Sequence, residues 1–130
     1  MPIIRIKDMN DGCLAFDLED LLELLGGQAL QSVWRCKAEE AISKALPINL
    51  ANTFNVHEGH DGLTFKKLAS ETRQIIDGVF EAFNLQSEIP WVRLEVIDSS
   101  YWEAWATDEN FLKPFRARFT DVENVEGFLP

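Results

Sequence analysis

Cysteine is scarce in this sequence, and long apolar runs are absent. Only Cys13 and Cys36 occur, which is too few for the disulfide framework of a small secreted protein, and they form no CxxC pair for zinc or redox chemistry. No apolar run approaches the length that spans a bilayer, and the start of the chain meets charge too early for a signal peptide. We therefore expect free thiols, a cytoplasmic location and no membrane-spanning segment.

Basic residues are also in short supply. There are 12 Lys and Arg against 22 Asp and Glu, which gives a net charge of −10. Phosphate backbones need a basic footprint, and anionic membrane surfaces repel a protein of this charge, so we expect neither nucleic acid nor a membrane as a partner. A basic protein partner fits this balance. The same charge can also serve only to keep the protein soluble.

The sequence lacks the common signatures of catalysis. Gly26 and Gly27 are not followed by the Lys-Ser/Thr ending of a P-loop or by the spaced glycines of a dinucleotide-binding fingerprint. Asp98, Ser99 and Ser100 are standard turn residues, and no base held by a third group marks a serine nucleophile. The sequence therefore favours a protein without enzymatic activity, and we expect no cofactor.

One short loop resembles a metal site. His57 and His60 flank Glu58 and Gly59, and histidine and carboxylate groups are ligands for zinc and other transition metals. Their spacing differs from the i, i+4 pair that zinc proteases carry on a helix, so a third ligand would have to come from elsewhere. One interpretation is a metal-dependent enzyme that uses His57 and His60. The other is a solvated loop without a metal.

The chain does have enough apolar sequence for a core. It has 130 residues, of which 46% are hydrophobic and 26% are charged, which is the balance of an ordinary globular protein. This length suits a single domain over residues 1–130. No internal repeat or low-complexity tract divides it.

A β-hairpin is predicted at the start of the chain, around the turn residues 10–12. A three-residue loop with glycine in the left-handed position would pair Met9 with Cys13. That register sets Arg5 opposite Asp17, a favourable cross-strand pair. We reject a two-residue loop here because it would mix basic and large apolar side chains on one face.

Two helices are predicted from the spacing of apolar residues. Asp17 has the position of an N-cap for a short helix that Gly26 and Gly27 end. Residues 63–84 carry apolar side chains at helical spacing and predict a long amphipathic helix. Gly78 lies inside this helix, either as a tolerated weak spot or because another group approaches it closely.

Four other stretches have weaker patterns. Residues 30–46 fit a helix, or a strand followed by a helical turn, and the pattern does not separate the two. Residues 48–62 are rich in turn-forming residues and predict a connection. Residues 107–119 predict a helix in preference to a strand, although Pro114 lies within it. The acidic tail, residues 121–130, is expected to be loosely held.

A second β-hairpin is predicted over residues 91–106, with a loop of residues 99–101 that sets residue 98 opposite residue 102. One face is uniformly apolar and should pack on the core; it carries Val92, Leu94, Val96, Trp102, Ala104 and Ala106. The opposite face mixes large aromatic side chains with charges; it carries Trp91, Arg93, Glu95, Ile97, Glu103 and Trp105. Tryptophan and arginine are enriched at binding hot spots. We therefore predict a site for a protein partner at Trp91, Arg93, Glu95, Glu103 and Trp105, unless another element covers the two tryptophans.

These observations predict the α+β class. An antiparallel sheet built from the N-terminal and C-terminal hairpins would be packed by a long amphipathic helix and shorter helices. The leading functional hypothesis is a small, acidic, cytoplasmic binding or regulatory module, of the kind that neutralises a toxin or acts as an adaptor. The alternatives are the metal-dependent enzyme and a self-associating structural protein, a homodimer through the Trp91 and Trp105 face.

Overall fold

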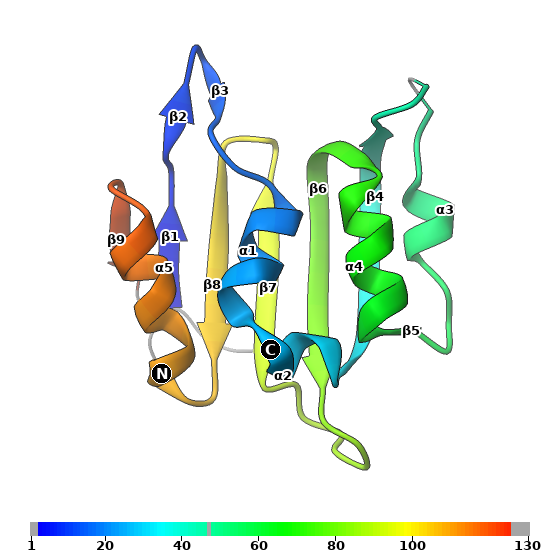
Figure 1. The fold of residues 1–130 in the computed structure, drawn as a ribbon. Helices are drawn as coiled ribbons and strands as arrows, with labels where there is room; N and C mark the ends of the chain where they lie inside the picture. The colour runs from blue at the N-terminus through cyan, green and yellow to red at the C-terminus, as the bar shows by residue number, and fades with distance from the viewer. Residues whose placement is uncertain (1–2, 47, 126–130) are drawn as a thin grey trace.

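The computed structural model describes residues 3–46 and 48–125 of the chain. A seven-stranded sheet, antiparallel at every pair, has the strand order β5-β4-β6-β7-β8-β1-β9, and the helices lie on one of its faces (Figure 1). Its strands are β1 (Ile3–Ile6), β4 (Val33–Ser43), β5 (His60–Asp61), β6 (Thr72–Phe83), β7 (Val92–Ile97), β8 (Tyr101–Ala106) and β9 (Val122–Val125). A separate two-stranded hairpin holds β2 (Met9–Asn10) and β3 (Cys13–Leu14). The helices are α1 (Leu18–Leu25), α2 (Gly27–Leu30), α3 (Ala51–Phe54), α4 (Gly62–Ser70), the 3-10 helix η1 (Glu109–Leu112) and α5 (Lys113–Arg118).

The expected combination of helices with an antiparallel sheet is confirmed, but the long amphipathic helix over residues 63–84 is wrong. Only α4 is helical there, and from Thr72 the chain continues as the longest strand of the sheet, β6. The apolar residues of this stretch recur at a spacing that suits a helix, yet many are β-branched or aromatic and fit a strand equally well. Pairing with two neighbouring strands, β4 and β7, decides in favour of the strand.

The side chain of Phe80 approaches Gly78 closely, which agrees with one of the two interpretations of this glycine. Gly78 is in the middle of β6, and the ring of Phe80 folds back over it: a Cβ built on Gly78 would lie 2.9 Å from Phe80 Cζ. Because Phe80 is fully buried among other aromatic side chains, its ring has little room to move away. The glycine therefore allows the ring to pack flat against the sheet.

The turns of both hairpins were predicted in the right places, but the registers are wrong, and the N-terminal hairpin is a short separate ladder rather than part of the main sheet. In the first, Asp11 and Gly12 form a two-residue loop with φ of 51° and 80°, so Met9 pairs with Leu14. The ladder ends after two pairs, so the basic and apolar side chains that argued against this loop never meet. The expected pairing of Arg5 with Asp17 is absent, because β1 pairs with β8 and β9 and places Arg5 opposite Glu103.

In the second hairpin the loop is Asp98 to Ser100, and Ile97 pairs with Tyr101. The register is displaced by two residues from the prediction. Because side chains alternate with a period of two, a displacement of two leaves the residues of β7 and β8 on the faces to which they were assigned. Trp91 is the exception, because it lies just before β7 and its side chain turns to the helix side. The division of this hairpin into an apolar face and a mixed face therefore stands.

The remaining stretches resolve as follows. Residues 33–43 of the ambiguous segment form strand β4, and the connection 48–62 contains the short helix α3 and the strand β5. Residues 109–118 are helical, with Pro114 in the first turn of α5, where a proline removes no internal hydrogen bond. The tail begins with β9 on the edge of the sheet rather than as a loose segment; its residues 126–130 lie outside the described part of the chain. In the described ranges, no helix has the length and apolar character needed to span a membrane.

The core lies between the sheet and the helices. Alternate residues of the strands point to this side and are buried; among them are Ile4, Ile6, Trp34, Phe80, Leu94, Val96, Trp102 and Ala104. The helices bury their apolar side chains against them, α1 with four leucines and α4 with Phe65 and Leu68. Phe54, Phe65, Phe80 and Trp102 form a chain of aromatic contacts with ring centroids about 6 Å apart. This face of the sheet is therefore buried in the core.

Candidate functional site

The opposite face of the sheet carries no helix among the described residues, and we call it the uncovered face (Figure 1). The strand registers assign to it Ile3, Arg5, Val33, Arg35, Lys37, Val79, Glu81, Phe83, Arg93, Glu95, Ile97, Tyr101, Glu103, Trp105 and Glu123. Lys7, just after β1, joins them through its ion pair with Glu123. Most of these side chains are partly exposed, and charged and apolar types alternate among them. Antiparallel sheets commonly pack one face on the core and leave the other in contact with solvent. The partly exposed charges and apolar groups of the uncovered face are therefore available for contacts.

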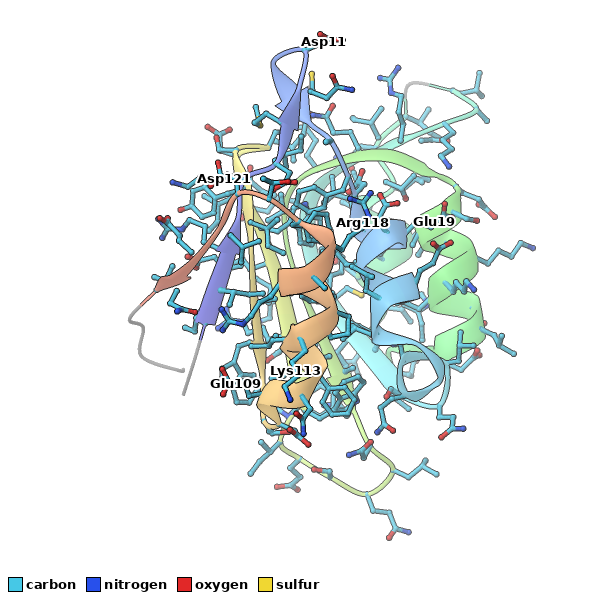
Figure 2. All side chains as sticks on the ribbon, turned by 60° about the vertical axis from the view of Figure 1, so that its left-hand side comes forward. Asp11, Glu19, Glu109, Lys113, Arg118 and Asp121 are labelled. Carbon is cyan, nitrogen blue, oxygen red and sulfur yellow. The ribbon has the colours of Figure 1, made fainter. Side chains whose placement is uncertain are left out.

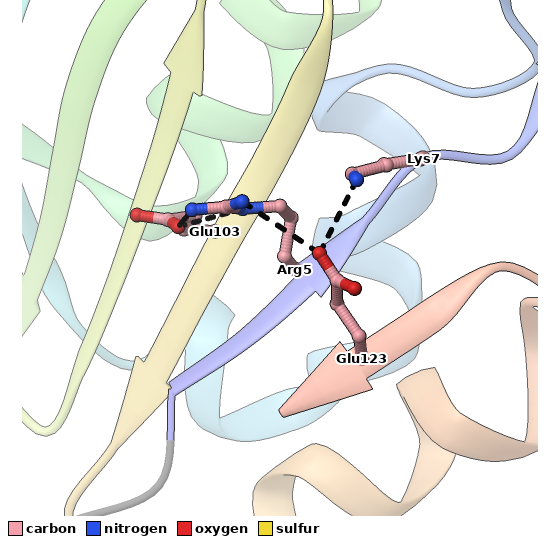
Figure 3. A network of polar contacts seen from close by, with 4 residues as sticks. All are labelled: Arg5, Lys7, Glu103 and Glu123. Carbon is pink, nitrogen blue, oxygen red and sulfur yellow. Dashed lines mark hydrogen bonds and ion pairs between the residues drawn. The ribbon is translucent and has the colours of Figure 1, made fainter. Parts of the chain in front are cut away.

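Ion pairs join the strands at one side of the uncovered face (Figure 3). Arg5 donates from Nε and Nη2 to Glu103 Oε2 at 3.0 and 2.8 Å, and its Nη1 lies 3.6 Å from Glu123 Oε1. Lys7 Nζ lies 3.2 Å from the same Glu123 oxygen. The guanidinium also lies over the ring of Tyr101, 4.4 Å from its centroid. The hydrogen bond to Glu103 raises the pKa of Arg5, so the guanidinium stays charged.

Two carboxylates meet at the middle of the uncovered face. Glu95 of β7 is directly opposite Glu103 of β8. Like charges directly opposite each other in an antiparallel pair are destabilising, because their Cβ atoms are only about 5 Å apart. Arg5 holds Glu103, whereas the only ion pair of Glu95 in the described structure is a long one, 3.5 Å from Arg93 Nη2. Glu95 is the less compensated of the two.

The two tryptophans predicted as contact residues are both buried. Trp91 is 3% exposed and lies on the helix side, where its Nε1 donates to Ser32 Oγ at 2.8 Å and its ring is 4.6 Å from that of Phe111. Trp105 belongs to the uncovered face but is only 5% exposed, between Arg93 and Ile3 on the neighbouring strands. The exposed part of the predicted site is therefore its charged part.

Arg93, Glu95 and Glu103, which the sequence placed on one face, are brought together by the structure, with side chains 24%, 33% and 20% exposed. Sequence reasoning did not find Arg5, Tyr101 or Glu123 as their neighbours. Arg5 reaches Glu103 across 98 residues of sequence, and only the pairing of β1 with β8 and β9 creates that contact. The position of Arg5 between Ile4 and Ile6 indicated that its side chain lies on the opposite face of the strand from theirs. It did not indicate which strands pair with this one.

The uncovered face is not the source of the net charge of −10. It carries five basic side chains, Arg5, Lys7, Arg35, Lys37 and Arg93, and four acidic ones, Glu81, Glu95, Glu103 and Glu123. The helices carry four acidic and five basic side chains, so the acidic surplus lies mainly in the loops, at the helix caps and at the ends of the strands. Figure 2 shows two of these acids, Asp11 at the tip of the β2–β3 hairpin and Asp121 just before β9, at the same end of the sheet.

The two histidines proposed as metal ligands have different surroundings. His60 Nε2 lies 2.9 Å from the carbonyl oxygen of Phe54, and His60 begins β5 opposite Trp34. His57 is exposed and lines a cavity of about 360 Å³ beside β4, together with Arg35, Cys36, Lys37 and Glu81. Within residues 3–46 and 48–125, no three His, Cys, Asp or Glu side chains gather closely enough to hold a metal ion. Burial raises the pKa of the Cys36 thiol to about 12, so it stays protonated.

A second cavity, of about 410 Å³, lies between the N-terminus of α1 and the start of β6, with Trp102 among its lining residues. Asp17 borders it and caps α1 in a reciprocal capping box with Asp20. Burial raises the pKa of Asp17 to about 7, against the opposing effect of hydrogen bonds from the backbone amides of Leu18 and Ile75. The Asp17 carboxylate therefore has a structural role as the cap of α1. The basic side chains of Lys44 and Arg73 also line the cavity, so its lining contains charges of both signs.

Comparison with protein-family models, with curated proteins and with solved structures found no match for this chain.

Proposed function

We propose that this protein is a non-catalytic, cytoplasmic binding module that docks a protein partner on the uncovered face, as a toxin-neutralising or adaptor protein would. The observation that carries the proposal is the contrast between the two sides of one sheet. Helices bury one side, while the other presents partly exposed charges and apolar side chains over several strands. Such a mixture of apolar groups with polar surroundings is typical of the interfaces of non-obligate complexes.

The alternatives have less support. A metal-dependent enzyme would need a third ligand beside His57 and His60, and the described residues place no such group there. A homodimer whose twofold axis passes through the Glu95–Glu103 pair would bring these side chains of the two copies together. Four carboxylates would then meet at the centre of the interface, and juxtaposed like charges there cost several kcal/mol, roughly.

The test changes the shape of the uncovered face without changing its charge. Val79 lies at the middle of this face on β6, opposite Lys37 and Glu95, and Val79→Tyr adds bulk there while keeping a residue that favours strands. Leu63→Tyr, on the exposed side of α4, is the matched control on the helix side. We expect a partner captured from native lysate by the unchanged protein to be retained by Leu63→Tyr and lost by Val79→Tyr. Equal retention by both variants, or no partner on the unchanged protein, would contradict the proposal.

A further inference from the structure

The carboxylate pair at the middle of the uncovered face narrows the chemistry of the partner. Glu95 and Glu103 are directly opposite each other, and both side chains are partly exposed, at 33% and 20%. Among the described residues, Arg5 binds Glu103 closely through two nitrogens, whereas the cation nearest to Glu95 is Arg93 on the same strand, at a long 3.5 Å. A site with two acceptor groups and one close cation has room for a second cation.

The residues around the pair are suited to a long basic side chain. Val79 lies beside Glu95 on β6, and Tyr101 lies two residues before Glu103 on β8. Lysine and arginine side chains have apolar stems that pack on such groups while the charged end meets a carboxylate. The guanidinium of Arg5 already lies over the ring of Tyr101, so this part of the uncovered face accommodates a cation.

A second observation on the same face is independent of the carboxylates. The side-chain donors Arg93 Nε and Trp105 Nε1 are buried and have no hydrogen-bond acceptor among the described residues. They belong to the cross-strand pair next to Glu95 and Glu103. A buried donor without an acceptor costs roughly 1–3 kcal/mol, so within residues 3–46 and 48–125 the uncovered face lacks acceptors for these donors as well. A peptide segment supplies both missing groups, a basic side chain and main-chain carbonyls.

We propose that the partner places an arginine or lysine side chain of an exposed segment between Glu95 and Glu103. This inference rests on the proposed function, and it specifies the charge that the uncovered face recognises. A second copy that docks about a twofold axis through this pair does not fit, because it brings the same carboxylates to the same place. The net charge of −10, which lies mostly elsewhere, would attract a basic partner from a distance, and the carboxylate pair would fix its position.

The experiment uses the full chain and two peptides, tetra-arginine amide and tetra-citrulline amide, which have similar shapes but differ in charge. Binding is followed by the backbone amide NMR shifts of the protein at low salt. We expect tetra-arginine to shift the amides of residues 92–97 and 101–106, and tetra-citrulline to shift none of them. Glu95→Gln should weaken the binding of tetra-arginine about two- to fivefold, the effect of one partly exposed ion pair.

Glu88→Gln is the matched control, because it removes the same charge from an exposed loop away from the uncovered face. It should change the affinity less than twofold, roughly, as only the long-range field is altered. Glu103→Gln tests the other half of the pair and should weaken binding like Glu95→Gln. The unperturbed amide spectrum of each variant shows whether it is folded.

Two results would overturn the inference. One is a set of shifts centred on the acidic residues at the start of α1 in place of strands β7 and β8. The other is an equal loss of affinity in Glu95→Gln and Glu88→Gln. If the captured partner is lost with Val79→Tyr but bound unchanged by Glu95→Gln, the docking face stands and only its charge recognition is wrong. If Val79→Tyr keeps the partner, the proposed function itself has failed.

Discussion

The two faces of the sheet satisfy their side chains in different ways. On the helix side, Phe80 and Trp102 are fully buried and touch other aromatic rings from α3, α4 and the sheet. On the uncovered face, the residues between them, such as Glu81 and Glu103, are partly exposed and are held by ion pairs or by no close partner in the described structure. The same strands therefore alternate between a side that determines stability and a side whose side chains are free to take up another role.

This difference shows how much of the uncovered face is needed for folding. Apolar burial contributes roughly 25 cal/mol for each Å² removed from water, whereas exposed ion pairs contribute about 0–1 kcal/mol each. Replacing charges on the uncovered face should hence leave the fold intact, while replacing residues on the other side should not. The predictions below test this division, in order of the expected size of the effect.

The largest effect is expected for Phe80→Ala compared with Phe83→Ala. Both residues lie on β6, but Phe80 points to the helices and is fully buried, whereas Phe83 is half-buried on the uncovered face beneath Arg35. Removing a buried phenylalanine leaves a cavity and costs about 3–5 kcal/mol, and the half-buried ring should cost about 1–2 kcal/mol. Urea unfolding of the two variants measures both losses. Equal losses would show that the uncovered face is part of a second core.

The division into two faces was predictable where it depended on local alternation. In residues 92–106 the assignment of Leu94 and Trp102 to the core and of Glu95 and Glu103 to the other face holds, although the register was displaced by two residues. Burial of Trp105 was not predictable in the same way. It depends on what lies against the ring, which alternation does not specify.

Nonlocal pairing was the part that the sequence did not reveal. The pattern of residues 63–84 satisfied helical spacing through its β-branched residues, and the neighbours of β6 come from residues 33–43 and 92–96. Likewise, nothing near Arg5 in sequence indicates Glu103, and the turn at Asp11 suggested a local partner strand instead. A candidate site that spans β1, β8 and β9 is therefore found only once the strand order is known.

An intermediate effect is expected from the pH dependence of Asp17, which lies on the helix side. Its pKa rises from 3.8 to about 7 on folding, because burial disfavours the carboxylate. Between these values the folded state holds a proton that the unfolded state has lost, so stability falls as pH rises from about 4 to 7. Asp17→Asn keeps an N-cap acceptor but does not titrate.

The measurement is the difference in unfolding free energy between the unchanged protein and Asp17→Asn across this pH range. The variant should gain relative stability as pH rises, on the order of 1–2 kcal/mol by pH 7, a value reduced for the partial solvation of the side chain. Taking the difference removes the contribution of the other carboxylates. A difference that stays constant with pH would mean that Asp17 has an ordinary pKa and that the cavity beside it is well solvated.

The smallest effect is expected for Arg5→Gln on the uncovered face. Arg5 holds Glu103 and approaches Glu123, but its side chain is 27% exposed, so its loss should cost only about 0.5–1 kcal/mol. Because solvent-exposed charges are screened, 1 M salt should reduce this loss by about half or more. Lys37→Gln, on the same face and without an ion pair in the described structure, should show no such salt dependence. If the loss from Arg5→Gln is unchanged by salt, Arg5 contributes through packing on Tyr101, and the uncovered face has more of the character of a core than its charges indicate.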